Sequence, residues 1–428
     1  MILKGCVFVS KDNKHDVTRR NFLYTFGTAG TAMGLFSMAD QAEANQLPAQ
    51  SGEVPRDAKG NIIAGFEKQN TKNNGSGKWQ PFSNRKVRVG IAGYGLCKFG
   101  AQFFFQNHPN VEVAAVSDLD SGRCAGLAKA VGCSKTYGSC EEMIKDKNID
   151  AIFITTDAPS HARLAIMALN HGKDVATAVP AVFGFSAEED ARKLFESVKK
   201  SGKKYMMFET SAFHAYTYAS RMLYQAGTFG KLIYSEGEYY HVNAGQLGSY
   251  NPKNGKIDKN GWRKGLVPMW YPTHSTAFYI AVSGGRLTDV SCLGMPSIHP
   301  ELQPHNNDYN NMFGTEVALF KTSEGGMSRM AVSWDMRNAH GEKGRVYGQK
   351  SINKKINTNR PPLPPGVQGG GHGGSHGQLT NNFIESILLD KKPAVDISDA
   401  LNMTMSGVIA HKSALKDGQW MKVPQYDL

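Results

Sequence analysis

The sequence has few cysteines, and they are not grouped. Six occur among 428 residues, at Cys6, Cys97, Cys124, Cys133, Cys140 and Cys292. No two of them have the close spacing of a zinc site or a redox pair. Removal of the N-terminal leader described below would leave an odd number, which argues against a framework held wholly by disulfides. The sequence therefore predicts cysteines that pack in the core, and no metal site.

The sequence also lacks a long apolar run and a concentrated basic segment. With 40% hydrophobic and 20% charged residues, the composition is typical of a soluble globular protein. The formal charge is +12, but the basic residues are scattered, without the arginine-rich helix or interleaved aromatics of a nucleic-acid-binding surface. We interpret the excess charge as a solvated basic surface, and we expect neither a nucleic-acid partner nor a stable membrane span.

Residues 1–44 are predicted to be an export signal. Paired arginines at Arg19 and Arg20 precede a moderately apolar stretch at 24–38, and Ala42-Glu43-Ala44 follows it. This order of features is typical of a twin-arginine signal with a small-residue cleavage box. We expect export to the periplasm, or otherwise out of the cytoplasm, through the twin-arginine machinery, with cleavage after Ala44.

The next segment, residues 45–84, shows no apolar period. It is rich in Gly, Asn, Lys, Gln and Pro, and it is interpreted as a flexible arm or linker.

A strand, a glycine turn and a helix are predicted at the start of the folded part. Alternating apolar residues over 87–91 lead into Gly93-Tyr94-Gly95, and an apolar segment follows at 99–105. Gly93 permits a tight turn, and Gly95 removes the side chain where a pyrophosphate approaches the backbone. The pattern therefore predicts a dinucleotide-binding turn, although the third glycine of the usual fingerprint is absent.

The residue that follows the second predicted strand favours one cofactor. The buried strand at 111–117 ends at Asp118, at the spacing from which a carboxylate receives ribose hydroxyls. A bare carboxylate there repels a 2′-phosphate, so NAD is predicted. Arg123 nearby leaves NADP as the less favoured alternative.

Strands and helices then alternate as far as residue 208. Buried strands are predicted at 151–155, 174–177 and 204–208, with helices at 160–171 and 187–201. Repeated crossovers of this kind predict an α/β fold with a parallel, doubly wound sheet. Ligands bind such sheets at the carboxyl ends of the strands, so one crevice is expected to collect Gly93, Gly95, Asp118, Thr155, Thr156, Val179 and Pro180.

Four segments of this half resemble the glucose-fructose oxidoreductase, inositol dehydrogenase and MocA family. They are Val89-Gly90-Ile91-Ala92-Gly93-Tyr94-Gly95, Ala115-Val116-Ser117-Asp118, Thr155-Thr156-Asp157-Ala158-Pro159-Ser160-His161 and Ala178-Val179-Pro180. The resemblance implies a Rossmann domain at 85–208 and a C-terminal α+β domain at 209–428. The second domain is expected to carry a large, open, mainly antiparallel sheet for the substrate and for homo-oligomers. The implied cofactor residues are Gly93, Tyr94, Gly95, Asp118, Thr155, Thr156, Asp157, His161, Val179 and Pro180.

The local sequence of the second half fits that expectation. Aromatic and β-branched residues predict strands at 230–242, 286–294, 312–321, 326–336 and 343–352. Helices are predicted at 379–389 and 397–415.

The chain departs from the ordinary dehydrogenases of the family. Those enzymes act on a sugar hydroxyl with a lysine in a Glu-Lys-Pro turn and an Asp-x-x-x-His pair. Here Ala178 and Val179 take the glutamate and lysine positions, and Trp270 takes the aspartate position. His274 alone matches, which argues against simple hydride exchange assisted by that lysine.

With these departures the chain resembles the NAD-dependent α-N-acetylgalactosaminidases of this superfamily. The resemblance rests on a Val-Pro turn, Tyr271-Pro272-Thr273-His274 and Gly371-His372-Gly373-Gly374-Ser375-His376. The main hypothesis is an exported NAD(P)-dependent oxidoreductase that acts on a sugar or glycoside with a tightly retained cofactor. One alternative is a redox-neutral glycosidase that oxidises C3, eliminates the C1 substituent, adds water and returns the hydride. A second is a nucleotide-binding sugar sensor without catalysis.

His274 is the candidate base, because a neutral imidazole at the start of the helix predicted at 273–282 can accept a hydroxyl proton. Tyr271 and Tyr240 are candidates for a second acid or base if a cation such as Arg263 lies near, with packing as the competing interpretation.

The predicted substrate residues lie on both sides of the candidate base. They are Trp262 and Trp270, whose rings are candidates to stack on a sugar face, together with Arg263, and His372 and His376 in a glycine-rich loop. The two histidines are interpreted as substrate contacts in preference to metal ligands.

The leader predicts the start of the mature chain. N-terminal sequencing of the exported protein is expected to begin at Asn45, and replacing Arg19 and Arg20 together by lysine is expected to leave the protein in the cytoplasm. An exported chain that still begins at Met1 would contradict this.

Overall fold

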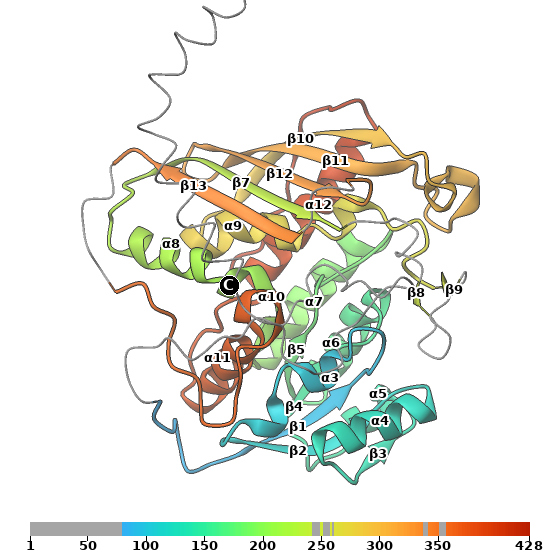
Figure 1. Ribbon diagram of the computed structural model, residues 1–428, viewed down its shortest axis with the longest axis vertical. Helices are drawn as coiled ribbons and strands as arrows, with labels where there is room; N and C mark the ends of the chain where they lie inside the picture. The colour runs from blue at the N-terminus through green and yellow to red at the C-terminus, as the bar shows by residue number, and fades with distance from the viewer. Residues whose placement is uncertain (1–78, 242–248, 251–256, 259–260, 337–340, 351–356) are drawn as a thin grey trace, which may run out of the picture. The chain divides into compact units, whose positions relative to one another are not determined.

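The computed structural model describes residues 79–241, 249–250, 257–258, 261–336, 341–350 and 357–428. The leader predicted at 1–44 and most of the arm predicted at 45–84 lie outside these residues. The described residues form two six-stranded sheets with helices packed against them (Figure 1). Among these residues, no helix combines the length and the apolar character needed to cross a membrane.

The first sheet is parallel throughout and has the strand order β3-β2-β1-β4-β5-β6. Its strands are β1 Val87–Ala92, β2 Val111–Ser117, β3 Thr136–Tyr137, β4 Ala151–Ile154, β5 Asp174–Thr177 and β6 Tyr205–Met207. The central strands are almost wholly buried because helices cover both faces, which explains their continuous apolar sequence. The strand order reverses between β1 and β4, which is where such a sheet binds its ligand. The predicted Rossmann fold is confirmed.

Local sequence signals set most of the helix ends in this half. The helices are α3 Phe99–Gln102, α4 Ser121–Val131, α5 Cys140–Ile144, α6 His161–Asn170 and α7 Ala187–Ser201. The Ser139 hydroxyl accepts the Glu142 N–H at 3.2 Å, and Gly132 and Gly202 end α4 and α7 in the left-handed conformation. The helix predicted at 99–105 is shorter than expected, because Phe104 is left-handed and breaks it.

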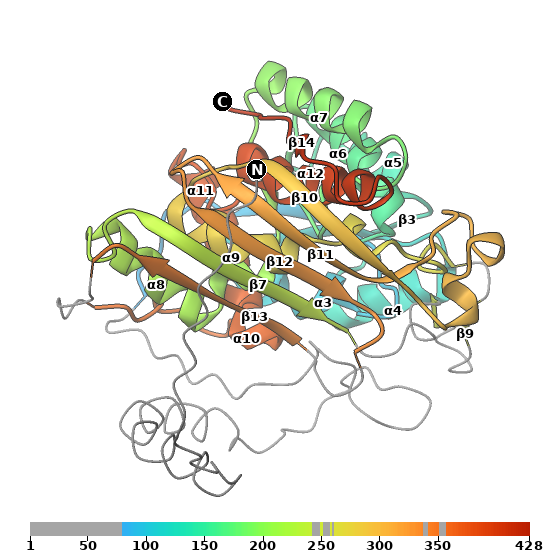
Figure 2. The same ribbon diagram turned by 90° about the horizontal axis from the view of Figure 1, so that it is seen from above.

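The second sheet is mainly antiparallel, with β7 and β12 as its parallel pair. In the order β13-β7-β12-β11-β10-β14, its strands are β13 Gly341–Gly348, β7 Leu232–Tyr240, β12 Met327–Ser333, β11 Phe313–Thr322, β10 Leu287–Pro296 and β14 Met421–Lys422. Figure 2 looks onto this sheet. Along β11 buried and exposed residues alternate, as expected for a sheet with one solvated face. A separate two-stranded ribbon joins β8 Ser249–Tyr250 to β9 Ile257–Asp258.

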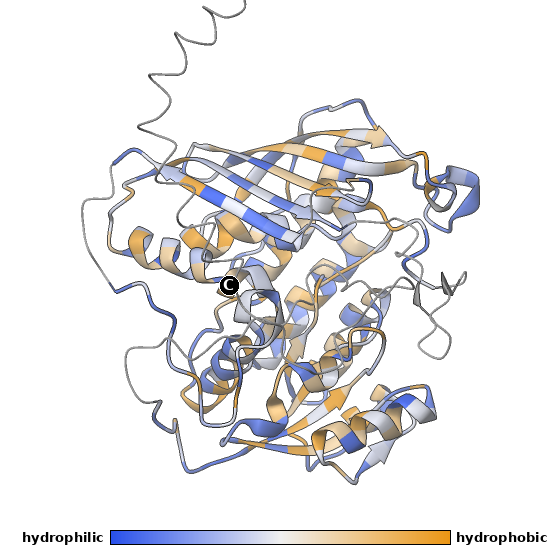
Figure 3. Cartoon of the chain, in the orientation of Figure 1, coloured by the Kyte–Doolittle hydropathy of each residue, from blue (hydrophilic) through white to orange (hydrophobic). Residues whose placement is uncertain are grey.

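The covered face of the second sheet packs on α9 Thr273–Ser283 and α12 Ile397–Ala414. Both helices are buried almost all round, and their sequences combine apolar residues with mostly small polar ones. Figure 3 shows the hydrophobic residues concentrated along β1, β2 and the helices beside the two sheets. The apolar pattern therefore defines an interior that continues from one sheet to the other.

The C-terminal helices also return to the first sheet. The remaining helices are α8 Ala215–Gln225, the short α10 Gly371–Gly374 and α11 His376–Leu388. The Thr380 hydroxyl donates to the Phe103 carbonyl at 2.6 Å, and the Met207 N–H donates to Val395 at 3.1 Å. Segments far apart in the sequence thus meet beside the carboxyl ends of the first sheet.

A close approach of β7 to α9 predicts a destabilising substitution. In Gly237→Ala, the added methyl group would lie 2.0 Å from the Ser275 carbonyl oxygen. We expect this overpacking to lower the free energy of unfolding by about 1–3 kcal/mol, measured by urea denaturation. The control Gly138→Ala, at an exposed bend where the nearest atom is 3.5 Å away, should unfold like the unsubstituted chain. Equal midpoints for the two variants would contradict this packing.

Candidate functional site

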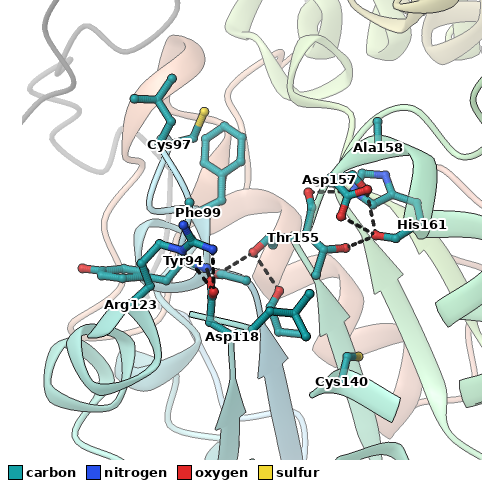
Figure 4. Close-up of a pocket in the computed structure, with 18 of the residues that line it drawn as sticks. Tyr94, Cys97, Phe99, Asp118, Arg123, Cys140, Thr155, Asp157, Ala158 and His161 are labelled. Atoms are coloured by element: carbon teal, nitrogen blue, oxygen red, sulfur yellow. Dashed lines mark hydrogen bonds and ion pairs between the residues drawn. The ribbon is translucent and has the colours of Figure 1, made fainter. Parts of the chain in front are cut away.

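A cleft of about 810 Å³ lies at the carboxyl ends of the parallel strands (Figure 4). The turn after β1, the end of β2 and the loops after β4 and β5 line it. Its predicted cofactor residues are Gly93, Tyr94, Gly95, Asp118, Thr155, Thr156, Asp157, His161 and Val179. Trp262, Arg263 and Tyr271 line it from the second half of the chain. The cleft is therefore bounded by residues more than 150 positions apart.

The glycine turn leaves room for a phosphate group. Gly93 has a φ of +103°, and a Cβ there would lie 2.4 Å from the Thr155 carbonyl oxygen. A Cβ on Gly95 would meet nothing within 4 Å. The Thr155 hydroxyl lies within hydrogen-bond distance of the carbonyl oxygens of Ala92 and Gly93, at 3.0 and 2.9 Å, which fixes the turn. The turn therefore fits a dinucleotide, because only the space above Gly95 is open to a ligand.

Asp118 lies at the end of β2 with its carboxylate already oriented. Its Oδ2 accepts the Tyr94 N–H at 2.8 Å, and its Oδ1 pairs with the Arg123 guanidinium at 2.9 Å. A carboxylate oxygen offers two acceptor directions, so Oδ2 keeps one for a ribose hydroxyl. The structure thus places Asp118 and Arg123 together at the edge where the adenosine half of a dinucleotide is expected.

His161 contacts the loops that follow β4 and β5 beneath the cleft. It is buried, and its Nδ1 and Nε2 lie 2.9 and 3.3 Å from the carbonyl oxygens of Pro180 and Thr156. Burial lowers the pKa of this imidazole, so it is neutral at physiological pH. Pro180 itself does not line the cleft and contributes through this contact.

Behind the cleft, a histidine lies between two buried carboxylates. His274 is 4% exposed, and its Nδ1 lies 2.8 Å from Glu209 Oε1 and 3.7 Å from Glu342 Oε2. Glu209 follows β6, His274 belongs to α9 and Glu342 belongs to β13. We call these three residues the acid–base cluster. Neither glutamate is predicted from the sequence, although a charged residue two positions after the buried strand β6 was a signal at Glu209.

The two carboxylates decide the charge of the imidazole. Burial by itself lowers the pKa of His274, but Glu209 and Glu342 outweigh it and raise the pKa to about 9. Burial by itself raises the pKa of Glu342, but the imidazoles of His274, His214 and His372 outweigh it and hold the pKa of that carboxyl well below its usual range. The sequence predicts a neutral imidazole at His274, which is wrong. In the structure it is a cation near neutral pH, because two anions face it.

Two tyrosines contact this histidine, and one of them is not the predicted residue. The rings of Tyr239 and Tyr271 lie 4.6 and 5.8 Å from the His274 ring. Tyr240 instead lies near Glu238 and Arg329, because successive side chains of β7 point to opposite faces of the sheet. Burial raises the pKa of both Tyr239 and Tyr271, so both phenols are protonated at neutral pH.

The glycine-rich loop brings two more imidazoles to the site. His372 Nδ1 lies 3.0 Å from His376 Nε2, and the His372 ring stacks 6.0 Å from the His274 ring. His372 has a φ of +49°, a strained conformation for a residue with a side chain. The Arg360 guanidinium holds the loop by donating to the carbonyl oxygens of Gly373 and Gly374 at 2.8 and 3.1 Å. Tertiary contacts thus fix both predicted histidines near the cluster.

The two predicted tryptophans have different environments. Trp262 lines the cleft, where a ring face can contact a ligand. Trp270 is 4% exposed and packs edge to face against Phe183, Phe185 and Tyr309. Trp270 is therefore a core residue, and the structure does not bring it to the cleft.

The acid–base cluster also has the chemistry of a metal site. One ligand atom from each of Glu209, His274 and Glu342 lies within 4.8 Å of the others. Glu209 Oε2 and Glu342 Oε1 are buried without a hydrogen-bond partner among the described residues. Carboxylate and imidazole groups bind divalent transition metals, so these residues are the ones described that can hold such an ion.

Comparisons with known proteins agree with this geometry. Residues 87–209 match the family model GFO_IDH_MocA, described as an oxidoreductase family with an NAD-binding Rossmann fold. Over 197 residues the chain is 30% identical to glycosyl hydrolase family 109 protein 1 of Bacteroides fragilis strain YCH46, covering 44% of this chain and 41% of that protein. The corresponding protein of Porphyromonas gingivalis is 28% identical over the same length. The match thus spans about two fifths of these curated relatives.

Solved structures share the fold across most of the chain. Scyllo-inositol dehydrogenase from Lactobacillus casei, solved with NAD(H) and scyllo-inositol, gives a TM-score of 0.61 at 17% identity, covering 79% of this chain and 99% of that one. A levoglucosan dehydrogenase, solved with NADH and levoglucosan, gives 0.63 at 14% identity, covering 80% of this chain and 100% of that one. At these identities the likeness shows the fold alone.

The charge of the cluster predicts an unusual titration. We expect the His274 imidazole to titrate near pH 9, measured by nitrogen-15 NMR of labelled histidines, and Glu209→Gln to lower this midpoint. Because the folded pKa exceeds the ordinary 6.5, the stabilisation is complete below pH 6.5 and is lost as the pH rises through 9. Glu238→Gln, which removes a carboxylate paired with Arg329, is the control and should leave the midpoint unchanged. A midpoint near 6.5 in the unsubstituted chain would refute the ion pair.

Proposed function

We propose that this chain, whose residues 87–209 match the Gfo/Idh/MocA oxidoreductase family with its NAD-binding Rossmann fold, oxidises or reduces a hydroxyl-bearing carbon of a sugar or glycoside. NAD is the proposed cofactor, held by the glycine turn and by Asp118. The nicotinamide supplies a hydride acceptor when it is bound.

One observation carries the proposal. The dinucleotide cleft and the acid–base cluster adjoin, because Tyr271 lines the cleft and its ring also lies 5.8 Å from the His274 ring. Oxidation of an alcohol carbon removes a hydride from carbon and a proton from oxygen, so it needs an acceptor for each. A nucleotide cleft with a buried imidazole behind the lining residue Tyr271 provides both.

The charge of His274 relates the reaction to pH. Below pH 9 the imidazole carries a proton, which suits the return of a hydride to a ketone because the alcohol oxygen gains that proton. Above pH 9 the imidazole is neutral and can accept the hydroxyl proton during oxidation. His274 therefore serves the two directions of one redox step in different protonation states.

Retention of the cofactor follows from the proposed export. A twin-arginine substrate folds before it leaves the cytoplasm, and outside there is no soluble nicotinamide pool with which to exchange. We therefore propose that NAD(H) stays bound and is regenerated within each catalytic cycle. Periplasmic location and assembly into a homo-oligomer belong to the same proposal.

A redox-neutral glycosidase is the second candidate. The named relatives that match 197 residues of this chain are glycosyl hydrolases of family 109. In that chemistry a ketone at C3 acidifies the proton at C2, which allows the C1 substituent to leave, and water then adds before the hydride returns. Such a cycle consumes no cofactor, in agreement with a retained nucleotide.

Identification of the nucleotide tests the proposal directly. We expect NAD(H) to be released when the purified mature protein is denatured. Net nicotinamide reduction with a sugar supports a dehydrogenase, whereas release of sugar from an aryl glycoside without net reduction supports the glycosidase.

His274→Ala should lower either rate by about 10²–10⁴-fold, the usual contribution of a positioned acid or base. A chain that binds sugar and nucleotide but turns over neither class of substrate would indicate a sensor.

A further inference from the structure

Arg263 is a cation at the cleft without a matching anion. Its side chain is partly exposed and lines the cleft, and among the described residues no carboxylate lies within ion-pair distance of it. Its contacts are Cys97 Sγ, 3.9 Å from Nη2, and the Trp262 ring, 4.9 Å from the guanidinium carbon. Other arginines, such as Arg88 and Arg123, pair with carboxylates.

An uncompensated guanidinium in a partly desolvated site is costly unless a ligand supplies the negative charge. The groups around Arg263 do not supply it, because Tyr239 and Tyr271 are protonated phenols and burial raises the pKa of the Cys97 thiol. A guanidinium binds oxyanions such as phosphate through two parallel hydrogen bonds. Arg263 is thus suited to an oxyanion that enters the cleft.

The position of Arg263 indicates which oxyanion. Cys97 follows Gly95 by two residues, so the guanidinium lies beside the turn whose open space is the one suited to a diphosphate. This contact also brings the second half of the chain against the Rossmann turn. An arginine at this place can bridge the two walls of the cleft through a bound anion.

The loop that carries Arg263 is itself held in place. The Tyr309 hydroxyl donates to the Trp262 carbonyl, and the Leu266 N–H donates to the Arg263 carbonyl at 3.1 Å. The Trp262 ring packs edge to face on Phe183. The guanidinium is therefore presented from an ordered backbone, which reduces the entropy lost when it binds an anion.

We propose that Arg263 closes over the diphosphate of the bound nicotinamide dinucleotide and retains the cofactor in the cleft. This inference rests on the proposed function, since it requires a dinucleotide there. The residue that retains the cofactor then lies outside the Rossmann fold, so the second half of the chain controls cofactor release. An anionic sugar is the other source of the same oxyanion chemistry.

The test measures cofactor release in the full mature protein. Bound NADH is chased with excess NAD⁺, and its release is followed by fluorescence in the unsubstituted chain and in the variants Arg263→Met, Arg263→Lys and Lys264→Met. We expect release from Arg263→Met to be about 10–100-fold faster, the size of a lost charge-assisted contact, with Arg263→Lys intermediate. Lys264→Met removes the neighbouring cation, which does not line the cleft, and should behave like the unsubstituted chain.

The outcomes separate this inference from the proposed function. One contrary outcome is that Arg263→Met releases NADH at the rate of the unsubstituted chain and yet raises the KM for a carboxylated sugar while leaving the KM for its neutral analogue unchanged. In that case the oxyanion belongs to the substrate and the inference is wrong. Equal release rates for all four proteins without any KM effect also overturn it. If the unsubstituted chain neither carries nor binds a dinucleotide, the proposed function fails with it. Matching circular dichroism melting curves for the variants exclude misfolding as the cause.

Discussion

The ion pair between His274 and Glu209 is the interaction on which the rest of the site depends. A buried carboxylate and a buried imidazole each carry a large desolvation cost, which is offset only when the two lie in contact. The contact requires the end of β6 and the start of α9 to meet, and Glu342 adds β13 to the same point. The cluster therefore ties the parallel sheet to the antiparallel one, and its position fixes where a proton can be exchanged next to the cleft.

The cleft depends in turn on backbone geometry. Gly93 takes a conformation that a side chain would exclude, and Gly95 leaves open the space above the turn. The loops around this space are held by polar contacts to main-chain oxygens, such as those of Thr155 and His161. A rigid floor of this kind suits a ligand that is bound through its phosphates and is seldom released. Tyr271 lines the far wall of the cleft, and His274 lies behind it.

The departures from the family pattern have a physical explanation in the structure. The position where the resemblance implies a lysine holds Val179, so that turn presents no ammonium group to the cleft. The usual aspartate position holds Trp270, which is part of the core. The charged neighbours of His274 are Glu209 and Glu342, which approach from other elements.

The sequence by itself determined the Rossmann fold, the glycine turn, Asp118 and the cleft-lining residues after β4. These depend on local periodicity and on the rule that parallel strands end at one edge, both of which are written in neighbouring residues. Only the tertiary structure decided that Tyr239 and not Tyr240 faces His274, that Trp270 is buried, and that two glutamates make the imidazole a cation. Strand register decides which tyrosine faces His274, and the rings of Phe183, Tyr309 and His411 bury Trp270. The charge of the imidazole requires charged groups from three distant elements to meet. The His274–Glu209 contact joins residues 65 positions apart, and no local pattern encodes such contacts.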